Sequence, residues 1–347
     1  MRPNWSEAAL ADFDACAEAI RHGSHSFHQA GRFLPVRLRQ PAHAVYAFCR
    51  LADDAVDETD LPLDDAVARL RCRLDRAYQG RPLDVPADRA FARTVEAFEL
   101  PRTLPEALIE GLAWDAEGRR YATLSALTDY AARVAGAVGG MMAVLLGERS
   151  APMLSRACDL GVAMQLTNFA RDVGADAGRG RVYLPLDWLA EAGIDPEALI
   201  ADPKPSAEVT AVLRRLLEHA RMLYERSEAG LARLPADCRP AMFAARFLYA
   251  EIGAQVARNG YDITRRAVVS KARKRLIVAR ALGAAALPLP RAWALPKPAL
   301  EETRYLVDAA AHVVPEQKSW ADRTESFIDI MAQLEARRRL DQSASRT

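Results

Sequence analysis

The chain has 347 residues, half of them hydrophobic, so it is long enough to bury a large core as one big domain or two smaller ones. Lysine and arginine (47) nearly balance aspartate and glutamate (46), which leaves a net charge of +1 at pH 7. This balance excludes a global electrostatic attraction to nucleic acid, so binding partners have to be argued from local features.

The amino terminus and the cysteines indicate a protein of the cytoplasm. The first residues, MRPNWSEAALADFDA, carry acidic side chains where a signal peptide needs an apolar core. The cysteines form no C-x-x-C pair, and their odd number leaves at least one unpaired. They are Cys16, Cys49, Cys72, Cys158 and Cys238. We expect reduced thiols and a cytoplasmic location.

Apolar residues recur at helical spacing along nearly the whole chain, and no alternating run of β-branched residues reaches strand length. The pattern predicts an all-α fold of many helices with short connections. Clusters of glycine and proline predict the helix breaks. These fall at Pro35 to Pro41, Gly80 to Pro86, Leu100 to Pro105, Gly147 to Pro152, Gly178 to Pro185, Asp202 to Pro205 and Leu234 to Pro240.

The first segment with recognisable chemistry is YAFCRLADDAVDE, Tyr46 to Glu58. Asp53 and Asp57 lie four residues apart, so on a helix they share one face at a separation of about 6 Å along the axis, and their charges repel. At about 100° per residue, Tyr46 and Arg50 fall on the same narrow face. A shared cation would remove the repulsion between the two carboxylates.

The longest uncharged apolar run is Val134 to Leu146, VAGAVGGMMAVLL. It is shorter than the roughly 20 residues that a bilayer span requires, so we interpret it as a buried helix. Its glycines and alanines would let a neighbouring helix, or a slender apolar ligand, approach the backbone closely.

The acidic pattern returns in QLTNFARDVGADAGRGRVYLP, Gln165 to Pro185, where Asp172 and Asp176 again follow an arginine and lie four residues apart. Gln165 and Asn168 share their helix face. A single D-x-x-x-D is most often a solvated helix face, but two copies with polar residues in line favour two helices that face each other across a cavity. Oxygen-only ligands favour Mg²⁺ or Mn²⁺ over zinc, and such ions would hold a diphosphate.

The chain changes character towards its C-terminus. A basic cluster is followed by the apolar segment Leu276 to Leu289, which would suit contact with anionic lipid headgroups; a solvated helix face is the alternative. Its residues are Arg265, Arg266, Lys271, Arg273, Lys274 and Arg275. Ala279 to Pro298 is rich in proline, and Gln317 to Leu340 predicts a further helix. We therefore expect a helical domain over 1–285 and an extension over 286–347.

In these motifs the chain resembles the squalene and phytoene synthase family, the head-to-head prenyl diphosphate synthases. The resemblance runs from about Ile20 to Lys274 and includes GSHSFHQAGRFLP, Gly23 to Pro35, as well as the two acidic segments. Within the family, the chain is most similar to the bacterial members that make 15-cis-phytoene. The resemblance implies a single large helical bundle of the class I isoprenoid synthase type, with its two acidic helices facing each other across a central cavity.

The resemblance also implies roles for individual residues. The Mg²⁺ ligands would be Asp53, Asp57, Asp172 and Asp176, with Asn168 adding an oxygen nearby. The diphosphate would be bound by Ser24, Ser26, Arg50, Arg171, Arg266, Gln165 and Asn168. The cavity would be lined by Phe27, Tyr46, Tyr130, Phe169 and Tyr249, and Tyr183 would join the aspartates, Arg50 and Arg171 in catalysis. Phe169 departs from the family, which usually has an aliphatic residue there, and this bears on pocket shape.

The implied reaction condenses two C20 geranylgeranyl diphosphates through prephytoene diphosphate to phytoene, with release of diphosphate. It would use two or three Mg²⁺ or Mn²⁺ ions and no nicotinamide or flavin, since the chain has no G-x-G-x-x-G after a strand. The alternatives are a presqualene diphosphate, dehydrosqualene or squalene-type synthase that uses C15 substrate, and a catalytically silent member that acts as a binding or assembly protein. The lipid substrate suggests peripheral contact with the inner face of a membrane.

Overall fold

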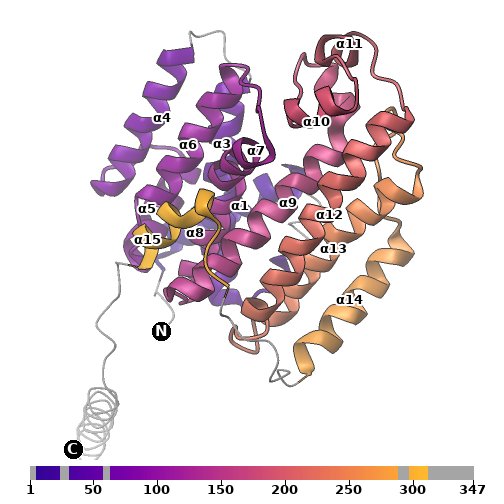
Figure 1. Ribbon diagram of the computed structural model, residues 1–347. Coiled ribbons are helices and arrows are strands. Elements are labelled where there is room, and N and C mark those ends of the chain that lie inside the picture. Colours follow the sequence, from indigo (N-terminus) through magenta and orange to yellow (C-terminus); the bar gives the residue numbers. More distant parts are fainter. Residues whose placement is uncertain (1–4, 24–30, 58–62, 288–296, 312–347) are drawn as a thin grey trace, which may run out of the picture. The chain divides into compact units, whose positions relative to one another are not determined.

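The computed structural model describes residues 5–23, 31–57, 63–287 and 297–311, and every regular element in these ranges is a helix (Figure 1). The expectation of an all-α fold is confirmed. The helix predicted within Gln317 to Leu340 lies outside the described residues. The elements are α1 (Glu7–Gly23), α3 (Val36–Asp57), α4 (Leu63–Tyr78), α5 (Pro86–Phe98), α6 (Thr103–Ala116), α7 (Leu124–Ala131), the π-helix η1 (Ala132–Gly136), α8 (Ala137–Leu145), α9 (Ala151–Ala177), α10 (Leu186–Glu191), α11 (Pro196–Ala201), α12 (Ala207–Leu231), α13 (Arg239–Arg258), α14 (Lys271–Ala286), the 3₁₀-helix η2 (Glu301–Thr303) and α15 (Arg304–Ala311).

The central element is α9, which carries the second acidic motif near its C-terminal end. Its 27 residues give it a length of about 40 Å. The helices α8, α12 and α13 and the π-helix η1 all pack against it, as its course through the middle of Figure 1 shows. Because so much of α9 is covered, most of its side chains between Met153 and Ala177 are buried. Packing on several sides therefore fixes the positions of the few polar side chains that α9 carries.

Proline marks four of the helix starts in the described part of the chain, as the sequence predicts. It occupies the first turn of α5, α9, α11 and α13, where backbone N–H groups make no hydrogen bond within the helix, so the missing N–H of proline costs nothing. The break predicted over Pro35 to Pro41 is shorter than expected, because α3 begins at Val36 and continues through Pro41. This proline lies near the start of a 22-residue helix whose remaining turns pack on the core, and that packing outweighs one lost hydrogen bond.

The apolar run Val134 to Leu146 forms the end of η1 and the whole of α8, and it is buried as predicted. Two glycines explain how closely its backbone approaches α9. A Cβ on Gly139 would overlap the carbonyl oxygen of Ala157, and a Cβ on Gly161 would overlap that of Ala135. The small residues thus serve a helix crossing. No helix among the described residues is both long enough and apolar enough to cross a bilayer.

The C-terminal part of the described chain is tied to α9 and α12 by a buried ionic network. Arg156 and Arg226 both donate to one oxygen of Asp159, at 2.7 and 3.0 Å. The same arginines donate to the backbone carbonyls of Lys297 and Pro298. The described residues belong to one compact unit, Met1 to His312, and the division after residue 285 stays a prediction.

Candidate active site

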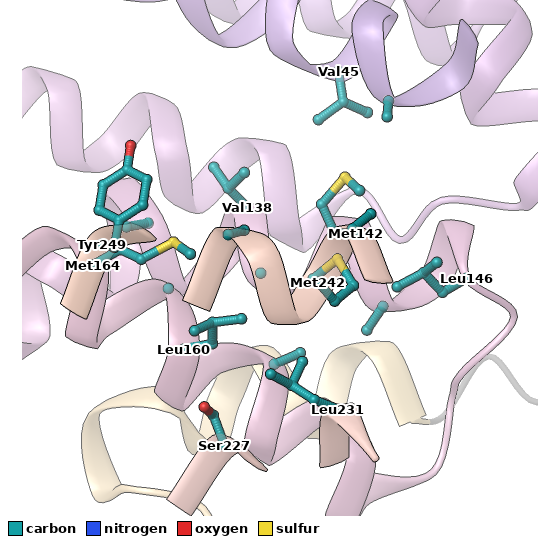
Figure 2. A pocket seen from close by; sticks show the side chains of 18 of the residues that line it. Val45, Val138, Met142, Leu146, Leu160, Met164, Ser227, Leu231, Met242 and Tyr249 are labelled. Atoms are coloured by element: carbon teal, nitrogen blue, oxygen red, sulfur yellow. The ribbon is translucent and has the colours of Figure 1, made fainter. Parts of the chain in front are cut away.

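A long apolar cavity of about 320 Å³ lies between α3, α8, α9, α12 and α13. Figure 2 shows Tyr249 and Met164 towards one end and Leu146 and Met242 towards the other. Its lining is made mostly of alanine, leucine, valine and methionine side chains. Such a surface holds a flexible hydrocarbon and keeps water out.

The length of the cavity can be read along α9. Lining residues run from Met153, near the start of the helix, to Asn168, which lies one turn before Asp172. These 15 residues correspond to about 22 Å at 1.5 Å per residue. The cavity is therefore a long, narrow space that ends beside the second acidic motif.

The helix α3 forms one wall and places the first motif at the same end of the cavity. Tyr46 lines the cavity, and one turn further on Arg50 donates to Asp53 at 3.3 Å and to Asp54 at 3.1 Å. Asp57 is the last residue of α3. The side chain of Asp57 lies outside the described part of the chain.

The predicted residues Ser24, Ser26 and Phe27 all fall in the segment 24–30, outside the described residues. Their roles at the diphosphate and in the cavity stay predictions.

On the opposite wall, Asp172 is held by two arginines. Arg171 donates to both carboxylate oxygens, and Arg266 donates to Oδ1 at 2.9 Å. Burial alone would raise the pKa of Asp172, but the hydrogen bonds and charges of Arg171 and Arg266 hold the pKa below its ordinary value. The chain thus gathers one carboxylate and two guanidinium groups one helical turn beyond Asn168, where the cavity lining on α9 ends.

Arg266 comes from the loop between α13 and α14, nearly a hundred residues after Asp172. A glycine lets that loop come close, since a Cβ on Gly174 would overlap the carbonyl oxygen of Ile263. This contact between the two backbones sets the distance of the loop from α9. The hydrogen bond from Arg266 to Asp172 depends on that distance.

Asp176, one turn after Asp172, is in the opposite electrostatic situation. Burial and the negative charge of Asp172 raise its pKa to about 7, and Arg179 and Arg181 offset this only in part. The repulsion that the spacing predicts is therefore present in the folded chain. A cation between the two carboxylates would relieve it.

The amide pair that precedes these carboxylates also lines the cavity. Asn168 donates to Gln165 at 3.3 Å through Nδ2, while its Oδ1 is buried and has no hydrogen-bond partner. A buried amide oxygen without a partner is costly unless a ligand satisfies it. The orphaned oxygen lies one turn from Asp172 and fits a hard cation or its bound water.

Tyr249 of α13 connects the two walls. Its side chain is buried in the cavity lining, and burial raises its pKa to about 12, with smaller effects from Arg171 and Asp172 on α9 and from Tyr46 on α3. Tyr249 and Tyr46 both line the cavity, so α13 and α3 meet at its acidic end beside α9. That both acidic motifs are directed at one space stays a prediction.

Two other predicted cavity aromatics lie elsewhere. Tyr130 and Phe169 belong to a stack with Tyr121 and Tyr183, in which neighbouring ring centroids lie 4.6 to 6.4 Å apart. None of the four is among the residues that line the long cavity. Phe169 and Tyr183 instead border a small hollow next to Asp176 and Arg181. The stack flanks the acidic end of α9.

The structure adds Asp115, which sequence reasoning did not single out. Tyr183 donates its hydroxyl proton to Oδ1 of Asp115, and Arg181 lies 3.4 Å from Oδ2. Burial, followed by the charge of Asp115, raises the pKa of Tyr183 well above its ordinary value. Asp115 stands near the end of α6 and belongs to no acidic repeat, so only the three-dimensional arrangement reveals it.

Among the described residues, no group of three or more histidine, cysteine, aspartate or glutamate side chains is close enough to hold a metal ion by itself. The fit to a metal rests instead on the Asp172 and Asp176 pair and on the free Oδ1 of Asn168. These oxygens and the arginines beside them suit a cation that arrives together with a diphosphate.

Known proteins are similar to this chain in sequence and in fold. A sequence profile described as squalene/phytoene synthase matches residues 20–273. The phytoene synthase of Rhodobacter capsulatus is 54% identical over 339 residues, covering 95% of this chain and 98% of the relative. The phytoene synthase of Cereibacter sphaeroides is 52% identical over 346 residues, covering 95% and 96%.

Solved structures show the same arrangement of helices. A dehydrosqualene synthase in complex with a ligand has a TM-score of 0.74 at 32% identity and covers 79% of this chain and 96% of its own. A squalene synthase from Alicyclobacillus acidocaldarius has a TM-score of 0.69 at 26% identity, covering 74% and 97%.

Proposed function

The chain belongs to the squalene/phytoene synthase family, and from that premise we propose that it joins two molecules of geranylgeranyl diphosphate head to head in the cavity between α3 and α9. Its activity is that of a phytoene synthase, since it matches two such enzymes over nearly their full lengths at 52% and 54% identity. The product is phytoene, formed through prephytoene diphosphate with release of diphosphate.

One observation favours a C20 over a C15 substrate: the cavity is about 22 Å long along α9. With carbon–carbon bonds of about 1.5 Å, an extended isoprene unit of four chain carbons advances roughly 5 Å. Four units then need about 20 Å and three units about 15 Å. A C20 tail fills the available length, whereas a C15 tail leaves its far end empty.

We propose that two or three divalent ions, Mg²⁺ or Mn²⁺, enter with the substrate. Asp172, Asp176 and Asn168 would hold them on one side, and Asp53 and Asp57 on the other. When bound, the ions supply Lewis-acid stabilisation of the departing diphosphate. No nicotinamide or flavin is required, because the proposed product forms without a reduction.

The protein's own contribution begins with the diphosphate. Arg50, Arg171 and Arg266 now donate to aspartates, and a diphosphate gives the same guanidinium groups more acceptor oxygens in a bidentate geometry. Their positive charge stabilises the negative charge that develops as the allylic carbon–oxygen bond breaks. The apolar lining holds the prenyl tail and keeps water from the carbocation.

The rings of Tyr46 and Tyr249, which line the cavity, would stabilise cationic intermediates through their negative faces. The final step removes a proton, and the released diphosphate and a cavity tyrosine are the two candidate acceptors. Tyr46 and Tyr249 line the cavity, whereas Tyr183 donates to Asp115 and borders the small hollow beside Asp176.

Product analysis tests the proposal. Purified protein would be incubated with C15 and with C20 diphosphates and MgCl₂, first without and then with NADPH. A C40 hydrocarbon formed without reductant supports the proposal, and a C30 product contradicts it. Asp172→Ala should abolish turnover while circular dichroism remains unchanged; retained turnover would refute the assigned role of this carboxylate.

The substrate tail and the hydrocarbon product are both lipids, so we also propose that the protein works as a peripheral protein at a membrane surface.

A further inference from the structure

The helix α14 lies at the margin of the described structure in Figure 1 and packs against α13. Ile277 and Ala281 are its buried contacts, and Arg273 anchors it by donating to both oxygens of Glu251, at 2.8 and 3.1 Å. Arg273, Ile277 and Ala281 are four residues apart and so share one helix face at about 100° per residue. That face is turned towards α13, and the opposite face, which we call the outward arc, is turned away from it.

The outward arc is unusually apolar. It carries Leu276 and Leu282, which are 62% and 49% exposed, and just beyond the helix Leu287 is 67% exposed. Val268, in the loop before α14, is 72% exposed. Val268, Leu287 and Leu276 are the three most exposed large apolar side chains among the described residues. Exposed leucines scattered singly need no explanation, but a concentration on one helix does.

The segment that carries this arc is strongly basic. The described stretch from Ile263 to Leu287 contains no aspartate or glutamate and bears seven cations, in a chain whose net charge is only +1. They are Arg265, Arg266, Lys271, Arg273, Lys274, Arg275 and Arg280. Lys271 and Arg275 lie on the outward arc among the leucines, and both are exposed. The acidic charge that balances the chain therefore lies elsewhere.

We propose that the outward arc of α14 binds the surface of a membrane that contains anionic phospholipids. Leucines set between lysines and arginines match the boundary between acyl chains and headgroups, where apolar side chains insert and cations meet phosphate. A second copy of this chain is a poorer match, because two copies of the same arc would bring like charges together. The occupant has to be apolar and anionic at once.

The reason for the contact rests on the proposed function, because a prenyl diphosphate and a hydrocarbon both partition into lipid. The surface itself does not rest on it. Most of α14 lies beyond residue 273, where the match to the family profile ends. The exposure and charge that favour the contact are therefore properties of this chain.

Vesicle co-sedimentation tests the proposal. Full-length protein would be mixed with vesicles of phosphatidylcholine alone and with vesicles that also contain phosphatidylglycerol. Wild type should bind the anionic vesicles, and higher salt should weaken the binding. Lys271→Glu/Arg275→Glu should reduce the partition coefficient at least about tenfold, since each basic residue near an anionic surface contributes. Leu276→Gln/Leu282→Gln should reduce binding to the same vesicles while keeping the charge.

The matched control is Arg69→Glu/Arg71→Glu, which reverses two exposed cations on α4, at the opposite side of Figure 1. It should leave vesicle binding unchanged. Equal sedimentation of wild type and both α14 variants, or an equal loss in the α4 control, would overturn the proposal. So would conversion of a dimer to a monomer by Leu276→Gln/Leu282→Gln without a change in vesicle binding.

Turnover of detergent-dispersed substrate, measured on the same samples, separates this proposal from the proposed function. The α14 variants should retain that turnover, since Lys271, Arg275 and the two leucines do not line the cavity. Loss of vesicle binding with turnover intact supports the surface; absence of turnover in wild type would count against the proposed function alone.

Discussion

Gly174 of α9 touches the backbone of Ile263 so closely that a Cβ at position 174 would overlap the Ile263 carbonyl oxygen. This contact sets the distance of the loop that carries Arg266, whose Nε lies 2.9 Å from Oδ1 of Asp172. A residue without chemistry of its own therefore controls the position of Arg266, the arginine that we propose to bind diphosphate.

Gly174→Ala should displace that loop and lower kcat/KM at least about tenfold, because misplacing a substrate-positioning group is costly. The double variant Gly174→Ala/Arg266→Ala should have nearly the same kcat/KM as Arg266→Ala, because both substitutions act by removing the contribution of Arg266. Steady-state kinetics on the three variants measures this. The control is Gly178→Ala, where a Cβ would meet Ala175 O at an ordinary 3.5 Å. Additive losses in the double variant would contradict a positioning role.

Asp176→Asn should separate stability from activity. Removing the charge relieves the repulsion from Asp172, so the melting temperature without metal should rise by about 1–4 °C. Turnover should fall at least about 100-fold. MgCl₂ should raise the melting temperature of wild type by binding the folded chain, and it should no longer do so in this variant. Thermal unfolding with and without MgCl₂ provides the measurement. Glu96→Gln, at an exposed position of α5, should change neither quantity. A metal response as large as that of wild type would exclude Asp176 as a ligand.

The Glu251 carboxylate should make stability depend on pH. Burial favours its neutral form, but hydrogen bonds and charge from Arg273 and Arg258 hold its pKa below the ordinary 4.5. A lowered pKa in the folded state stabilises the protein above the unfolded pKa, and this contribution is lost as pH falls through the folded pKa. Glu251→Gln should therefore lower the melting temperature by about 2–5 °C at pH 7, and the difference from wild type should close below about pH 4.5.

A matched control for that experiment is Glu225→Gln. Glu225 pairs with Arg221 on the exposed face of α12, with side chains 55% and 69% exposed. The melting temperature should change by less than about 1 °C at any pH, because a solvated pair contributes little. Equal pH profiles for the two variants would show that Glu251 makes no special contribution.

Substitutions in α13 should shorten the cavity in steps. Ala241 and Ala245 both line it, one helical turn or about 6 Å apart, with Ala241 further from Tyr249. Ala241→Phe should fill the far end, so use of the C20 substrate falls while use of C15 is retained or gained. Ala245→Phe should reduce the use of both. Competition between C15 and C20 diphosphates, followed by product analysis, measures this; an unchanged product ratio in Ala241→Phe would refute the assumed direction of the tail.

The sequence predicts the helix faces that carry Tyr46, Gln165 and Asn168 to the cavity because these residues are local, while the metal and diphosphate roles beside them stay predictions. Tyr46 and Arg50, like Gln165 and Asn168, reach their places through helical periodicity alone, and the observed helices keep that register. The resemblance to a known family supplied the fold, which the structure confirms.

Other features depend on contacts between distant segments and leave no periodic trace. Asp115 meets Tyr183 only because α6 packs beside the turn that follows α9, and Arg266 meets Asp172 across 94 positions of sequence. The stacking of Tyr130 with Phe169 likewise requires two helices to be placed first. A pattern within one helix cannot encode which side chain another helix brings to it.

The glycine contacts between α8 and α9 bear on how the enzyme can be redesigned. At Gly139 and Gly161 the partner is a carbonyl oxygen of the main chain, which cannot change rotamer to make room. Any added carbon there separates two helices, so libraries that randomise the middle of this wall would mostly yield unfolded chains. Diversity in product length is better sought at the two ends, where side chains face side chains and can exchange volume.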